Sequence, residues 1–167
     1  MIFMLFLEVI SVFLVGVAMS MALAHALEYP GKLRLDEQTY LAVQTIYYPG
    51  FTIGGVGEIL AVIATLVLTI AMRNNSAAFW WALVAFIAVL AMHPVFWLIT
   101  QPVNRYWLKY QQLTKTGALF FGVHQDEQSA DRLPSWTYLR KRWGYSHIVR
   151  AAFSAIALIT LVIAVAI

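Results

Sequence analysis

The chain has 167 residues, of which 62% are hydrophobic and 11% charged, with a mean hydropathy of +0.76. Soluble domains carry about a quarter of charged residues. This composition therefore excludes an ordinary soluble domain and indicates one integral membrane domain over residues 1–167. The lack of cysteine excludes disulfides and thiolate metal sites, and the net charge of +3 is modest.

Four apolar runs, at about 2–27, 51–72, 77–100 and 148–167, predict four transmembrane helices. Each run reaches the roughly 20 residues that a spanning helix needs. The short turn from Arg73 to Ser76 predicts that the second and third helices form an antiparallel hairpin. We expect the first run to stay in the protein, because it contains Glu8 and lacks the basic start of a signal peptide. The fold class is therefore all-α, a four-helix transmembrane bundle.

The connection between the third and fourth runs has two notable segments. After Val103, the apolar residues recur at helical spacing and predict an amphipathic helix on the membrane surface; they are Tyr106, Trp107, Tyr110 and Leu113. The stretch LPSWTYLRKRWGYSH (133–147) then mixes aromatic with basic residues. This mixture is typical of an interfacial anchor, and it also suits the wall of a pocket for a flat lipophilic molecule. We expect no nucleic-acid binding.

Lysine and arginine predict the orientation. Nine of the eleven lie in the connections 28–50 and 101–147, whereas the opposite side holds only Arg73. The positive-inside rule then predicts that both connections are cytoplasmic and both termini outside, in what we expect to be a bacterial inner membrane.

Each predicted span carries an ionisable residue towards the side of the long connections. These residues are His25 and Glu28 in the first span, Glu58 in the second, His93 in the third, and His147 and Arg150 near the interface at the start of the fourth. An ionisable group inside a bilayer costs about 2.5–3.5 kcal/mol on insertion scales, so each is a candidate functional residue. The structural alternatives are an interfacial helix end for His25 and Glu28, a packed core imidazole for His93, and snorkelling for Arg150.

Two short motifs resemble those of a known family. Pro102 and Asn104 follow the third span, and Trp143 with His147-x-x-Arg150 opens the fourth. This pattern resembles the anthrone oxygenase-like family of small four-span membrane proteins. The resemblance implies a membrane oxidoreductase that acts on a small lipophilic phenol, anthrone or quinone-like substrate, in a polar pocket near the cytoplasmic side.

Under this interpretation, the motif residues have distinct catalytic roles. Oxidation requires a base that forms an electron-rich anion, and His147 or His93, backed by Glu58, suits that role. Arg150 can stabilise an oxyanion, and Asn104 can tie one helix end to a neighbouring helix.

The cofactor and the function class stay open. Nitrogen and oxygen ligands suitable for iron, copper or haem come from His25, Glu28, Glu58, His93 and His147, but no paired Glu-x-x-His motif of a di-iron site is present. Oxidation without a cofactor is the alternative. The competing function is a non-catalytic small transporter or an accessory subunit of a membrane complex. Besides the lipid bilayer, the candidate partners are a lipophilic small molecule, a second copy of the chain and a membrane complex.

Overall fold

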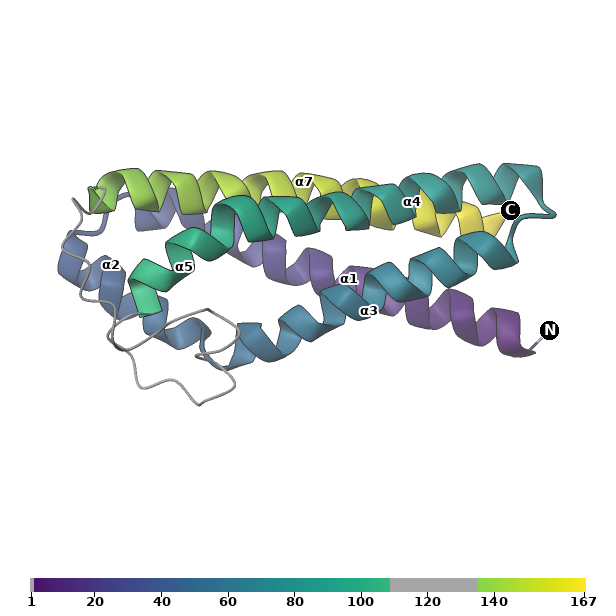
Figure 1. Cartoon of the computed structure of the whole chain (residues 1–167), viewed down its shortest axis with the longest axis horizontal. Helices are drawn as coiled ribbons and strands as arrows, with labels where there is room; N and C mark the ends of the chain where they lie inside the picture. The colour runs from purple at the N-terminus through teal and green to yellow at the C-terminus, as the bar shows by residue number, and fades with distance from the viewer. Residues whose placement is uncertain (1, 109–134) are drawn as a thin grey trace.

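Four long helices make up most of the computed structural model, which describes residues 2–108 and 135–167 (Figure 1). They are α1 (Ile2–Lys32), α3 (Gly50–Ala71), α4 (Ser76–Val95) and α7 (Trp136–Ala166). A π-helical segment, η2 (Phe96–Thr100), continues α4 into α5 (Gln101–Leu108). Four stretches are long and apolar enough to cross a membrane: Ile2–Lys32, Gly50–Ala71, Ser76–Trp107 and Trp136–Ala166. The predicted all-α, four-span bundle is therefore confirmed.

The helices close into a ring, because α7 packs on α1 and α4, and α3 packs on the same two helices. Both termini and the turn between α3 and α4 lie at one end of the bundle, which we call the terminal end (Figure 1). Asn75 accepts a hydrogen bond from the backbone N–H of Ala78, which caps α4, and its Nδ2 donates to the carbonyl of Ile167 at 3.4 Å. The other end, the α2 end, carries α2 (Glu37–Gln44), η1 (Thr45–Tyr47) and α5.

The buried positions of the long helices recur at intervals of three and four residues. In α1 they include Ser11, Val15, Ala18, Ala22, His25, Tyr29 and Lys32; in α3, Glu58, Ala61, Thr65 and Leu68; in α7, Trp143, His147, Arg150, Ser154, Ala157 and Leu161. This spacing is typical of helices that pack side by side in bundles. These buried positions are mostly apolar towards the terminal end and polar towards the α2 end. The same packed faces of the helices therefore form both the apolar core and the polar group of residues.

Two helices extend beyond the predicted spans at the α2 end. α1 continues to Lys32, and α7 begins at Trp136, where Ser135 caps it by accepting a hydrogen bond from the backbone N–H of Tyr138 at 3.3 Å. The basic and aromatic stretch is therefore the first part of α7. It is helical because Leu139 and Trp143 pack inward, in a cluster completed by Tyr40, Val103 and Trp107. Hydropathy marks only the lipid-crossing part of such a helix.

The helix of the third span does not end at Thr100 as predicted. Pro94 lies within α4, and the wide turn of η2 follows it directly. Proline cannot donate the usual backbone hydrogen bond, and π-helical turns are one way in which a helix absorbs such a defect. In α5, Val103 and Trp107 are buried while Arg105 and Tyr106 are exposed, so the described part of the predicted amphipathic helix packs its apolar face on the bundle. The predicted positions Tyr110 and Leu113 lie outside the described residues.

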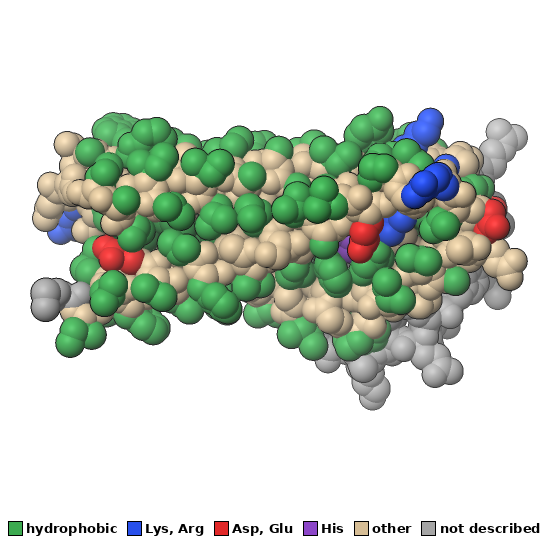
Figure 2. Space-filling view, turned by 180° about the vertical axis from the view of Figure 1, so that it is seen from behind, with side chains coloured by type: hydrophobic (Ala, Val, Ile, Leu, Met, Phe, Trp, Pro, Cys, Tyr) green, Lys and Arg blue, Asp and Glu red, His purple; other side chains and the backbone are tan. Residues whose placement is uncertain are grey.

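The outer surface of the bundle is apolar between its two ends. Figure 2 shows hydrophobic side chains along the middle of the molecule, with charged side chains towards the ends. Large residues such as Ile53, Ile63 and Ile159 are more than half exposed. A water-soluble monomer rarely carries so extensive an apolar surface. The lipid bilayer therefore covers this surface.

Candidate functional site: a polar pocket at the α2 end

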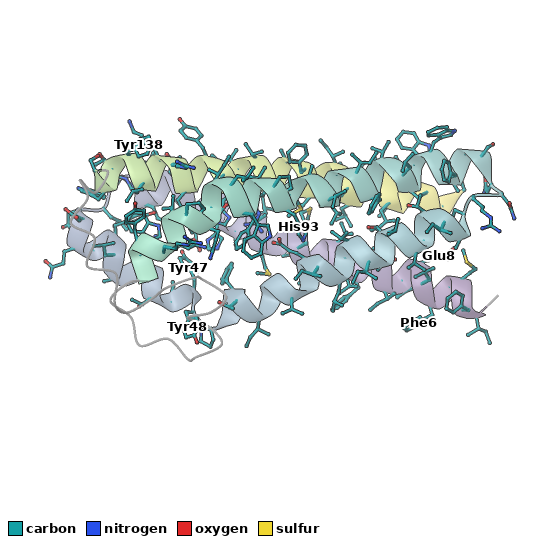
Figure 3. All side chains as sticks on the ribbon, viewed as in Figure 1. Phe6, Glu8, Tyr47, Tyr48, His93 and Tyr138 are labelled. Carbon is teal, nitrogen blue, oxygen red and sulfur yellow. The ribbon has the colours of Figure 1, made fainter. Side chains whose placement is uncertain are left out.

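A cavity of about 120 Å³ lies inside the bundle towards the α2 end. Six of the seven predicted catalytic and ligand residues line it: His25, Glu58, His93, Asn104, His147 and Arg150. In Figure 3, His93 lies towards the middle of the bundle, while Tyr47 and Tyr48, two further lining residues, lie nearer the α2 end. The structure thus brings together in one pocket residues from α1, α3, α4, α5 and α7.

The deep part of the pocket holds a buried ion pair between Arg150 of α7 and Glu58 of α3. The Arg150 and Glu58 residues are only 5% and 6% exposed. A lone charge at this position would carry a large desolvation penalty, which the opposite charge offsets. The sequence suggested that Glu58 backs a histidine; in the structure, its carboxylate pairs with Arg150. His147 and Arg150, which the sequence analysis placed near the interface, are both buried, because α7 starts at Trp136 and both positions belong to its packed face.

His147 lies beside this ion pair. Its Nδ1 is 3.3 Å from Nη1 of Arg150. A guanidinium can only donate, so Nδ1 accepts and the proton of the neutral imidazole resides on Nε2. Within the described residues, Nε2 of His147, Nε of Arg150 and Nδ1 of His93 have no hydrogen-bond partner although they are buried. Buried polar atoms normally have partners, so these three atoms are available to a bound molecule.

Aromatic side chains form the adjoining wall of the pocket. The ring of His25 is packed against His147, Phe51, Tyr47 and Trp143 at centroid distances of 4.2, 4.4, 4.5 and 4.8 Å. Such a wall suits a flat apolar molecule, because rings pack well face to face or edge to face.

Glu28 does not line the pocket but holds its α2-end wall in place. It accepts a hydrogen bond from the hydroxyl of Tyr47 and forms a 3.0 Å ion pair with Lys32. The ammonium of Lys32 also lies over the rings of Tyr47 and Trp143, at 4.2 and 4.7 Å. Burial, followed by the hydrogen bond to Glu28, raises the pKa of Tyr47 far above its usual range. The phenol therefore stays protonated and keeps η1 attached to α1.

Hydrogen bonds join α5 and η2 to α7. The indole N–H of Trp143 donates to Oδ1 of Asn104 at 2.9 Å. The hydroxyl of Thr100 donates to Ser146 at 2.9 Å, and Ser146 donates to the carbonyl of Trp143 at 2.7 Å. Asn104 thus connects two helices, as its position after Pro102 suggested.

The donor set does not fit a metal ion. Among the described residues, no group of three or more histidine, aspartate or glutamate side chains is placed to hold one. The rings of His25 and His147 pack against each other, tilted by 55°. Glu58 is paired with Arg150, and Glu28 with Lys32 and Tyr47. We therefore derive no chemistry from a metal bound by His25, Glu28, His93 and His147.

Several lining residues were not singled out as site residues from the sequence. They are Gln44, Tyr47, Phe51, Phe96, Thr100 and Trp107. Trp107 was expected on an amphipathic helix at the membrane surface, whereas the others carried no distinguishing signal. Their place in the pocket depends on how α2, η1 and η2 pack, which local sequence does not reveal.

Fold and site together define a class: a four-span membrane protein with a polar, aromatic-walled pocket at one end of its bundle. The sequence matches the family model described as anthrone oxygenase over residues 44–160, so the chain belongs to the anthrone oxygenase family. This confirms the resemblance expected from Pro102, Asn104, Trp143, His147 and Arg150. Comparison of the chain with curated proteins and with solved structures finds no match.

Proposed function

We propose that the protein is an oxidoreductase that takes a small lipophilic phenol, anthrone or quinone-like molecule from the bilayer and oxidises it in the pocket. The observation that carries this proposal is the buried group of Arg150, Glu58 and His147, which lines an otherwise aromatic cavity. A purely structural ion pair would need neither the cavity nor the unpartnered nitrogen atoms around it.

The family membership supports an anthrone as the substrate class, and the geometry suggests a role for each residue. Arg150, through Nε, and His147, through Nε2–H, donate to the substrate oxygen, where negative charge develops. His93 is the base, because Nδ1 of its ring has no hydrogen-bond partner within the described residues and is therefore available to accept a proton. Glu58 keeps Arg150 oriented and offsets its charge.

The reaction needs dioxygen as oxidant and no bound cofactor. His93 accepts a proton from the ring methylene of the anthrone, which leaves an enolate whose oxygen faces Arg150. The carbanion form gives its electron pair to dioxygen, a carbon–oxygen bond forms, and the proton returns to the peroxide. Loss of the second methylene proton with cleavage of the oxygen–oxygen bond then yields a ketone and one water. An apolar pocket favours this sequence, because it excludes bulk water from the anion.

We also propose that the α2 end faces the cytoplasm of a bacterial cell, with both termini outside. The distribution of lysine and arginine supports this orientation, since most of those in the described residues lie at that end: Lys32, Arg34, Arg105, Arg140, Lys141 and Arg142. The substrate would then enter from the inner leaflet.

Turnover of anthrone by the purified protein in lipid nanodiscs tests the proposed reaction. Formation of anthraquinone is followed by its absorbance together with oxygen consumption, and empty nanodiscs give the spontaneous rate. We expect His93→Ala to lower kcat about 10²–10⁴-fold, the usual contribution of a general base. Arg150→Lys should fall well short of the wild-type rate, because lysine lacks the planar guanidinium group. Lys141→Ala, an exposed position on the same helix as Arg150, is the control.

The competing function makes a different forecast for the same samples. A carrier or accessory subunit would bind anthrone without converting it, and the rate would equal that of empty nanodiscs. An optical spectrum and a metal analysis of the active preparation check separately that no chromophoric cofactor or metal ion accounts for turnover. Wild-type rates in both the His93 and the Arg150 variants would refute the assignment of these residues.

A further inference from the structure

Two unpartnered donors line the pocket away from the Arg150–Glu58 pair. The indole Nε1 of Trp107 and the amide Nε2 of Gln44 are buried, and neither has a hydrogen-bond partner in the described part of the chain. The Gln44 and Trp107 residues are only 4% and 8% exposed. Leaving a buried donor unpaired costs about 1–3 kcal/mol. The proposed catalytic group makes no use of either donor.

The two donors belong to one part of the pocket. Gln44 follows Tyr40 by one turn on α2, and the ring of Tyr40 packs against Trp107 at 5.4 Å. Trp107 lies in the cluster that includes Trp143. Trp143 precedes Arg150 by seven residues on α7, which corresponds to roughly 10 Å along the helix. The pocket therefore has polar groups at two levels, with the aromatic wall between them.

The chemistry of the donors restricts the ligand. An indole N–H can only donate, so its partner must be an acceptor atom. A carbonyl, hydroxyl or ether oxygen meets that requirement, whereas a hydrocarbon edge would leave the donor unpaired. A phenylalanine at position 107 would also be apolar and aromatic in this cluster, without leaving a buried donor unpaired.

We propose that Gln44 and Trp107 form a second oxygen-binding point, and that the substrate is an elongated flat molecule with an oxygen acceptor at the end remote from Arg150. This inference rests on the proposed function, because it places the reacting oxygen of the molecule at Arg150. Gln44 and Trp107 are then specificity residues. They select substrates that carry an oxygen acceptor remote from Arg150, and they take no part in bond breaking.

Two probes that differ by one oxygen test the second binding point. 2-Hydroxyanthraquinone carries a hydroxyl on an outer ring, whereas anthraquinone carries only the two carbonyl oxygens of its central ring. Their dissociation constants are measured by titration calorimetry with protein in nanodiscs, at a pH where the phenol is neutral, with empty nanodiscs as reference. We expect the wild type to prefer the hydroxylated probe about fivefold, the equivalent of one neutral hydrogen bond.

The variants Trp107→Phe and Gln44→Met remove one donor each; Gln44→Met keeps a side chain of similar length, and Trp107→Phe also removes one ring. Trp107→Phe should reduce the preference to about one while leaving the affinity for anthraquinone unchanged, and Gln44→Met should reduce it in part. Trp136→Phe is the matched control, since Trp136 packs on the same cluster but does not line the pocket. Thermal unfolding of each variant confirms that it is folded.

The outcomes separate this inference from the proposed function. A preference that persists in Trp107→Phe and Gln44→Met, or is missing in the wild type, overturns the second binding point. In that case the proposed site still stands if Arg150→Ala abolishes binding of both probes. Failure of the wild type to bind either probe overturns both. Loss of affinity for both probes in Trp107→Phe would show a packing role and would also refute the inference.

Discussion

The pair formed by Glu58 and Arg150 is the residue-scale feature on which the pocket depends. Two opposite charges in a buried site offset each other's desolvation, so the pair contributes little stability compared with apolar residues, while each half alone is costly. Experiment can therefore separate the contribution of these two side chains to stability from their contribution to function.

We expect Glu58→Gln to lower the free energy of unfolding by about 3–5 kcal/mol, because it leaves the guanidinium of Arg150 buried and unpaired. The double variant Glu58→Leu/Arg150→Leu should recover most of that loss yet fail to bind anthrone. Thermal unfolding in detergent and ligand titration on the same samples measure both effects. Glu37→Gln, an exposed position on α2, is the control. A double variant that binds normally would show that the pair has only a structural role.

The convergence of His25, Glu58, His93 and His147 could be predicted from the sequence, because all four lie towards the same side of the membrane in their predicted spans. The pairing of Glu58 with Arg150 could not. Pairing depends on which side of each helix faces the centre, and in helices that are apolar all round, hydropathy does not reveal that side. A finer signal existed in α3, where Glu58, Ala61, Thr65 and Leu68 follow the three-four spacing of a packing seam.

At the scale of elements, the close contact of α1 with α7 determines how the pocket is closed. Gly144 of α7 faces the ring of Tyr29 of α1, and a Cβ atom at position 144 would overlap that ring. The absence of a side chain lets the two helices approach each other where His25 and His147 are in contact.

We therefore expect Gly144→Ala to destabilise the protein by about 1–3 kcal/mol, the usual cost of overpacking, and to weaken ligand binding by spreading α1 from α7. Gly16→Ala is the matched control, because Gly16 is also helical and a Cβ there would meet no atom within 4 Å. The control should be neutral or slightly stabilising, since alanine favours a helix by up to about 1 kcal/mol over glycine. Equal melting temperatures for the two variants would contradict the close-contact argument.

The number of spans and the turn between α3 and α4 were predictable from apolar runs and from the Arg73–Ser76 segment, whereas the extensions of α1 to Lys32 and of α7 back to Trp136 were not. The course of the chain after Pro94 was not, because the sequence shows that a backbone donor is missing but not how the helix compensates. The structure uses the wide turn of η2, which places Thr100 against Ser146 and continues the chain into α5. Asn104 and Trp107 reach the pocket for that reason.

At the scale of the whole molecule, the orientation in the membrane can be tested with single cysteines, since the chain has none of its own. Gln38 is exposed at the α2 end, and Asn74 is exposed at the terminal end. An impermeant thiol reagent added to intact cells should label Asn74→Cys and spare Gln38→Cys, which should react only after lysis. The reverse pattern would place the pocket in the outer leaflet.

The division of the bundle into a polar and an apolar half has a consequence for energy conservation. The terminal half is closed by Leu7, Val15, Ala61, Leu68, Val89 and Leu161, all of them nearly inaccessible. Its buried hydroxyls donate to carbonyls of their own helices; these are Ser11, Thr65, Thr69, Ser154 and Thr160. Protons cross a membrane along chains of linked polar groups or water, and hydroxyls bonded within separate helices form no such chain between helices. Under the proposed function, proton transfers in the pocket would therefore exchange with one side alone, and turnover in an energised membrane would leave the proton-motive force undiminished.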